Sequence, residues 1–135
     1  MKKIELDIVQ IKKFLLTGGG ATICHLGMMW FLVWFGFNAT LSSSVGVIIG
    51  AVVNYIFQYH YTFESDTKHS KSIRNYLITV MLSFVSNLIL FMFFHEFLKI
   101  NVLFSQLLTS AMVALQNYII YKKFVFLKEG AIYEA

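Results

Sequence analysis

The sequence is short of charge, proline and cysteine, and each shortage excludes a class of structure. Only 13% of its 135 residues are charged, about half the ~25% usual in soluble domains, whereas 58% are apolar. So few charged side chains cannot cover the surface that a soluble fold of this size exposes, which excludes a soluble enzyme. Without proline, a break in any helix has to come from glycine or from packing. The single cysteine, Cys24, has no partner within one chain for a disulfide or a thiolate metal site.

Four long stretches contain no Lys, Arg, Asp or Glu. They are residues 14–37, 39–59, 76–94 and 102–121. At ~1.5 Å per residue, each is long enough to cross a hydrocarbon core of about 30 Å. The sequence therefore predicts an all-α membrane protein with four transmembrane helices. This transmembrane domain covers residues 14–126, between an interfacial segment, 1–13, and a cytoplasmic tail, 127–135.

Basic residues lie almost entirely on one side of the predicted spans, and Lys99 alone lies on the other. The ten on the first side are Lys2, Lys3, Lys12, Lys13, Lys68, Lys71, Arg74, Lys122, Lys123 and Lys128. Because loops rich in Lys and Arg stay in the cytoplasm, both termini of this multi-pass protein of the cell membrane are predicted to be cytoplasmic. These charges either set topology alone or also attract anionic lipid and phosphate. Since they flank spans, lipid is a better partner for them than nucleic acid.

The residue pattern of three segments near the membrane surface also predicts local structure. Apolar residues recur with helical spacing from Ile4 to Leu15, which fits an interfacial helix, an extension of the first span or a docking surface. The polar residues from Glu64 to Arg74 predict a mobile loop. The run at 18–20, Gly-Gly-Gly, is predicted to loosen the first helix.

The two halves of the sequence contain an internal repeat. Residues 54–63 close the second span and residues 117–126 close the fourth, 63 positions later, with Asn, Tyr, Ile and the final Phe identical. At an offset of 62, Thr17 matches Thr79. Two copies of a helix pair predict a parallel repeat about a pseudo-twofold axis along the membrane normal.

These repeated motifs resemble the GtrA-like family over residues 14–126. The similarity is carried by the opening Phe14-Leu-Leu-Thr-Gly-Gly, by Asn54-Tyr55 through Phe63, and by Asn117-Tyr118 through Phe126. The resemblance implies movement of a polyprenyl-phosphate-linked sugar, such as an undecaprenyl-phosphate sugar, across the cytoplasmic membrane for cell-surface polysaccharide or teichoic acid glycosylation. Related four-span modules anchor polyprenyl-phosphate glycosyltransferases, so a non-catalytic scaffold for such a partner is the alternative.

The sequence departs from the family pattern at the end of its first half. Tyr59, His60 and Tyr61 stand where the family usually has Arg and Trp, and His25 stands where the first span often carries Asp. The departures imply that the two halves contribute unequally to an asymmetric site.

Polar residues near the inner ends of the spans are the candidates for binding the lipid phosphate and the sugar. They are Asn54, Tyr55, Gln58, Tyr59, Arg74, Asn117, Tyr118, Lys122 and Lys123. The cations attract phosphate and the amides donate hydrogen bonds to it. Alternatively, the asparagines join neighbouring helices, and the tyrosines, with Tyr61 and Tyr121, form an aromatic belt at headgroup level.

Residues deeper in the spans add a polar pair and a packing face. His25 lies ~16 Å along the helix from Phe14, near mid-bilayer. It either couples proton movement to transport or forms a neutral hydrogen bond to the backbone or to Asn87 in the third span. Gly46 and Gly50 belong to a stripe with four-residue spacing that lets helices approach closely.

The sequence shows no catalytic arrangement, since its carboxylates all lie outside the predicted spans. We therefore expect neither enzymatic activity nor a cofactor or metal. Four spans enclose little volume, so a homodimer or larger assembly is expected.

Overall fold

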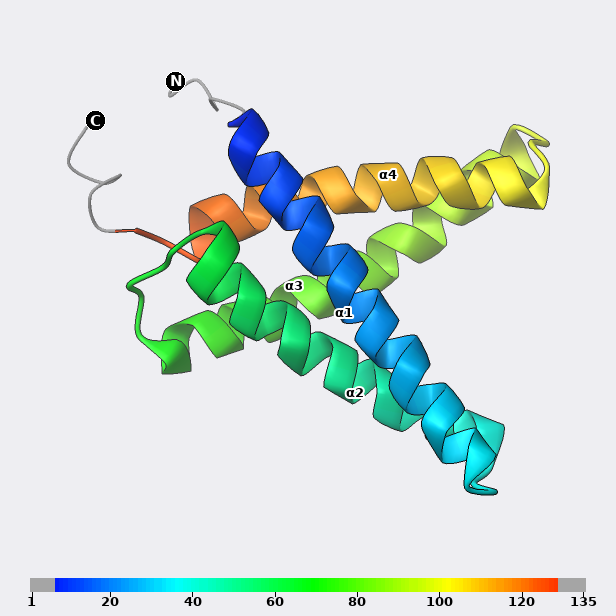
Figure 1. The fold of residues 1–135 in the computed structure, drawn as a ribbon. Coiled ribbons are helices and arrows are strands. Elements are labelled where there is room, and N and C mark those ends of the chain that lie inside the picture. The colour runs from blue at the N-terminus through cyan, green and yellow to red at the C-terminus, as the bar shows by residue number, and fades with distance from the viewer. Residues whose placement is uncertain (1–6, 129–135) are drawn as a thin grey trace. The chain divides into compact units, whose positions relative to one another are not determined.

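The computed structural model describes residues 7–128, which form four long helices and no strand (Figure 1). The helices are α1 (Ile8–Trp34), α2 (Ala39–Phe57), α3 (His69–Met92) and α4 (Val102–Ile120). Single π-helical turns follow three of them: η1 (Gln58–Thr62), η2 (Phe93–Phe97) and η3 (Tyr121–Val125). All four helices are long and apolar enough to cross a membrane. The predicted all-helical class and the number of spans are confirmed.

The first helix begins earlier than the uncharged stretch from which it was predicted. Residues 8–13 are the first turns of α1, so the extension of the first span holds for them. Asp7 caps this helix by accepting from the Val9 and Gln10 amides. The helix continues unbroken through residues 18–20, so the prediction of a loosened glycine run was wrong. Lys2 and Lys3, and the predicted tail from residue 129 onward, lie outside the described residues.

The third helix also begins earlier than predicted. The polar segment was expected to be a mobile loop as far as Arg74, but α3 starts at His69. The cause is a tertiary contact: the Ser72 side chain is fully buried, and its hydroxyl donates to the Val125 carbonyl at 2.9 Å. This bond holds the first turn of α3 against η3 and keeps it helical.

The chain divides into two compact units after Ser65. Unit 1 contains α1, α2 and η1, and unit 2 contains α3, η2, α4 and η3. In each unit a short turn reverses the chain, so the two long helices are antiparallel neighbours (Figure 1). The turn after α1 depends on Gly36, whose φ of 89° lets the Gly36 and Phe37 amides donate to Val33 and Leu32. Asn38 caps α2 and Asn101 caps α4, each through its side-chain oxygen.

Burial in both units is the reverse of the pattern in a soluble protein. Ser42, Ser105 and Thr109 are completely buried, whereas Ile23 is 72% and Trp34 is 81% exposed. Lipid solvates leucine and tryptophan as well as a protein core does, so these side chains gain nothing by turning inward. Small side chains instead let the helix backbones come together. The burial pattern therefore agrees with helices that are surrounded by lipid.

The predicted packing residues of α2 lie toward α1 in the structure. Gly46 and Gly50 are buried against His25 and Ala21 of α1. A Cβ atom built on Gly46 would lie 2.6 Å from the His25 carbonyl oxygen and 2.6 Å from its imidazole Cδ2. One on Gly50 would lie 3.0 Å from the His25 Cβ. Only glycine at position 46 permits this separation between α1 and α2.

Gly46→Ala should therefore destabilise unit 1. The added methyl meets the His25 carbonyl as well as its ring, and the backbone atom cannot move aside cheaply, so we expect a loss of about 1–3 kcal/mol, the usual cost of overpacking. The matched control is Gly27→Ala in α1, because a Cβ there meets nothing within 4 Å. Thermal unfolding in detergent should show a lower Tm for Gly46→Ala alone. Equal melting of the two variants would contradict the assigned packing.

Candidate functional site

Each unit has one end that carries most of its basic residues, here called its basic end. In unit 1 this end contains Lys12, Lys13 and η1. In unit 2 it contains the start of α3 and η3, with Arg74, Lys122 and Lys123. The opposite end of unit 2 carries only Lys99 among its described lysines and arginines. The predicted binding residues all belong to these two basic ends.

A short series of polar contacts joins the helices at the basic end of unit 1. The Thr17 and Thr62 hydroxyls lie 3.0 Å apart, and both side chains are buried. The Gln58 amide nitrogen donates to the Asn54 side-chain oxygen at 3.2 Å and to the Phe14 carbonyl at 3.4 Å. The Gln58 oxygen is buried without a hydrogen-bond partner. Asn54 thus bonds within its own helix, while Gln58 links that helix to α1.

Burial separates the predicted tyrosines into two groups. Tyr59, Tyr118 and Tyr121 are buried, so their interpretation as an aromatic belt was wrong. Tyr121 instead packs with Tyr76 and Phe126 in a cluster of rings whose centroids lie 5.3–6.1 Å apart. Tyr55 is half-buried, with its ring 6.0 Å from that of Tyr59, and Tyr61 is exposed. These phenol rings are large and rigid, so the buried ones brace the helix ends.

Lys13 makes a contact that sequence reasoning missed. Its Nζ lies 4.8 Å from the centroid of the Tyr61 ring and donates to the Tyr61 carbonyl at 3.4 Å. Cation–π attraction and the hydrogen bond together fix this ammonium beside η1. In the sequence Lys13 was counted only among the charges flanking a span. The signal that could have pointed to it was its position one turn before Thr17, the residue that matches Thr79.

Unit 2 has a corresponding set of ties at its basic end. The Asn75 amide donates to the Phe124 carbonyl at 2.8 Å. Farther along α3, the Ser83 hydroxyl donates to the Asn117 side-chain oxygen at 2.5 Å. Asn117 therefore joins α4 to α3 through its oxygen, as the interhelical alternative predicted. The same bond leaves its NH₂ group as the half of the amide that can donate elsewhere.

The cations of unit 2 point away from its packed interior. Lys122 is half-buried, with its Nζ 5.7 Å from the centroid of the buried Tyr118 ring. Lys123 and Arg74 are exposed. Tyr118 thus forms the inner wall of a basic surface rather than a contact surface of its own.

The two deep polar residues belong to different units. The His25 Nε2 is buried beside Gly46 and has no hydrogen-bond partner among the described residues. Asn87 is half-buried on α3. Their pairing and any proton coupling remain predictions. A second polar pair, absent from the predictions, joins the Ser86 hydroxyl to the Gln116 side-chain oxygen at 2.9 Å.

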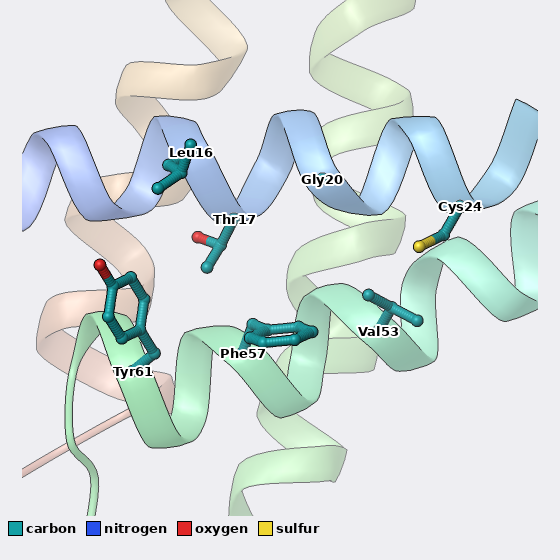
Figure 2. Close-up of a pocket in the computed structure, with 7 residues that line it drawn as sticks. All are labelled: Leu16, Thr17, Gly20, Cys24, Val53, Phe57 and Tyr61. Carbon is teal, nitrogen blue, oxygen red and sulfur yellow. The ribbon is translucent and has the colours of Figure 1, made fainter.

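Each unit also carries an open groove between its two helices. The groove of unit 1 has a volume of about 380 Å³ and is almost wholly apolar (Figure 2). Its lining residues are Leu16, Thr17, Gly20, Cys24, Val53, Phe57 and Tyr61. The groove of unit 2, about 420 Å³, contains the Ser86–Gln116 pair among apolar side chains. Neither groove could be read from hydropathy, because apolar side chains that line a groove and those that face lipid look alike in a sequence.

The four apolar helices, with amides and cations at their basic ends, agree with a comparison against known families. The model of the GtrA/DPMS transmembrane domain matches residues 13–126. The chain belongs to this family. No curated protein matches the chain. Membership in the GtrA/DPMS family indicates a role in handling polyprenyl-phosphate-linked sugars and confirms the resemblance seen in the sequence.

In this GtrA/DPMS domain the Ser83–Asn117 bond should carry measurable stability. Ser83→Ala and Asn117→Leu each remove it, and we expect the double variant to lose less than the sum of the two. A coupling of about 0.6–1.7 kcal/mol is typical of hydrogen bonds between membrane helices. Detergent unfolding of the four proteins in the cycle measures it. Strict additivity would show that Asn117 has no interhelical role.

Proposed function

We propose that this protein moves a polyprenyl-phosphate-linked sugar across the cytoplasmic membrane, for glycosylation of cell-surface polysaccharide or teichoic acid. The observation that carries the proposal is the family match across nearly the whole chain, on four membrane-crossing helices with amides and cations at their basic ends. The described residues lie mostly in helices that are able to cross a membrane, which supports transport as the proposed activity.

Both basic ends face the cytoplasm in this proposal. The support is the excess of Lys and Arg at these ends, because such residues stay inside during insertion. A sugar lipid made in the cytoplasm would then meet the cations first. Anionic lipid of the inner leaflet would gather at the same surface.

Lys122 and Lys123, with Arg74, attract the phosphate in this mechanism. Lys123 and Arg74 are exposed, and the Lys122 side chain extends over Tyr118. In unit 2 the NH₂ group of Asn117 would bind the headgroup beside these cations, and in unit 1 the half-buried Asn54 and Tyr55 are the candidates for headgroup contact. Gln58, Tyr59 and Tyr118 are buried, so in this mechanism they position the neighbouring side chains and do not bind the headgroup themselves.

We further propose that the two units are copies of one ancestral helix pair. The π-helical turns η1 and η3 start 63 residues apart, at Gln58 and Tyr121. The capping asparagines, Asn38 and Asn101, have the same offset. Since each helix pair presents only an open groove, we also propose a homo-oligomer as the working form.

A scaffold for a separate polyprenyl-phosphate glycosyltransferase is the second candidate. It is favoured by the family description, which names a transmembrane domain rather than a complete transporter. The two candidates differ in what deletion of the protein removes. A scaffold is needed for synthesis of the sugar lipid, whereas a transporter is needed only for its delivery to the outer leaflet.

The orientation is tested by thiol labelling of single cysteines in a Cys24→Ser background. Lys68→Cys and Lys122→Cys should react with an impermeant maleimide only after the inner face is opened. Lys99→Cys should react in intact cells. Labelling of positions 68 and 122 from opposite sides would overturn the proposed encounter with the cytoplasmic sugar lipid.

The transport proposal predicts a loss of phosphate capture in a Lys122→Ala/Lys123→Ala variant. At about 1 kcal/mol per lysine near an anionic surface, translocation at low lipid concentration should fall ~30-fold. The assay follows radiolabelled undecaprenyl-phosphate glucose between the leaflets of proteoliposomes. Lys99→Ala, at the other end of unit 2, is the matched control and should be unaffected. Unchanged transport by the double variant would refute the proposed role of these lysines.

A further inference from the structure

A glycine, Gly20, lies at the centre of the groove of unit 1 and leaves space there. Along α1 it extends from Leu16 to Cys24, about 12 Å at the helical rise. Between these side chains Figure 2 shows Gly20 opposite the Phe57 ring. A Cβ built on Gly20 would meet nothing within 4 Å, so the space over it is empty rather than a helix contact. The glycine therefore keeps a groove open and does not serve close packing.

The matching position in unit 2 carries a large side chain. The residue 62 positions after Gly20 is Leu82, and the groove described for unit 2 lies farther along α3, from Ser86 onward. A leucine is thus compatible with this place in a helix pair. The groove described near a basic end lies in unit 1.

A cation lies at the Tyr61 end of this groove. Tyr61 forms part of the groove wall, and the Lys13 Nζ lies 4.8 Å from its ring centroid. An ammonium has three N–H donors, and the Tyr61 carbonyl takes one of them. Among the described residues only this acceptor is assigned to the ammonium, so its other two donors can bind an anion next to the groove.

The charge of Lys13 is not needed for the contact that it makes within unit 1. In unit 2 a neutral amide makes the corresponding tie, since Asn75, 62 positions after Lys13, donates to the carbonyl of Phe124, 63 positions after Tyr61. The ammonium charge is therefore available to an anion beside the groove, and an apolar groove with one cation at its end fits a single-chain lipid with one phosphate.

We infer that this groove holds the first part of the isoprenoid chain of a polyprenyl phosphate, with the Lys13 ammonium paired with the phosphate. The inference rests on the proposed function and deepens it, because it assigns the lipid chain to unit 1 and gives its phosphate a cation there, in addition to the cations that attract it to the membrane surface. A bulk phospholipid has two chains and a larger headgroup, so it fits the groove and its single cation less well.

Cys24 provides a native probe of occupancy. It is the only cysteine, it is exposed, and it lines the groove at the end opposite Tyr61. In phosphatidylcholine nanodiscs, added undecaprenyl phosphate should slow alkylation of Cys24 by a lipid-soluble maleimide. Undecaprenol lacks the phosphate, so the concentration of undecaprenol that gives the same protection should be about fivefold higher, which is the effect of one lysine beside an anion. Equal potency of the two lipids, or equal protection by phosphatidic acid, would overturn the inference.

Two test variants, Gly20→Leu and Lys13→Asn, carry the residue that unit 2 has at the matching position. Gly20→Leu fills the groove and should abolish retention of radiolabelled undecaprenyl phosphate, a measurement that does not depend on Cys24. Gly19→Leu is the matched control, because it adds the same side chain in open space off the groove and should bind normally. Lys13→Asn keeps a donor for the Tyr61 carbonyl and should weaken protection by undecaprenyl phosphate about fivefold while leaving undecaprenol unchanged. Normal binding by Gly20→Leu and Lys13→Asn refutes the groove assignment.

The outcomes separate this inference from the proposed function. If the wild-type protein moves the sugar lipid and both variants bind and transport normally, the groove assignment alone fails. If the wild-type protein protects Cys24 as expected but moves no sugar lipid in proteoliposomes, the transport proposal alone fails.

Discussion

The structure depends on one constraint: in lipid, helices gain nothing from burying apolar side chains against each other, so other contacts must hold them together. Within unit 1 the approach of Gly46 to His25 brings two backbones close, and the Thr17–Thr62 bond joins them near the basic end. Within unit 2 the Ser83–Asn117 bond has the same role. The large apolar side chains therefore face outward, where lipid can solvate them.

Hydropathy and local sequence patterns predicted some of the helix boundaries and missed others. The starts of α2 and α4, at residues 39 and 102, agreed with the sequence because a capping asparagine precedes each uncharged stretch. The start of α3 did not, because the Ser72–Val125 bond makes a polar segment helical and no local pattern announces a tertiary bond. The π-helical turns were missed for a similar reason, since they change hydrogen bonding without a change in composition.

The candidate site was predictable in its location more than in its contacts. Charge and amide content identified the basic ends, yet Tyr118 is buried and Lys122 extends over its ring. A tyrosine near a helix end reads the same in sequence whether it faces headgroups or a neighbouring helix. Lys13 shows the converse, because a lysine before a span reads as a topology signal until its contact with Tyr61 is seen. The sequence does not show in which direction such a side chain points.

The matched positions of the two units separate residues that serve the helix pair from residues that differ between the units. Thr17 and Thr79 are both buried, as are Ser42 and Ser105, so these positions serve the helix pair itself. Two positions differ between the units: the open space over Gly20 shows that a glycine is not needed there for packing, and Asn75 shows that the charge of Lys13 is not needed for its contact with a carbonyl. A residue that costs stability and adds nothing to packing is kept for another reason. In unit 1 the reason we propose is a ligand, and the asymmetry between the units is where the chemistry of the protein should be sought.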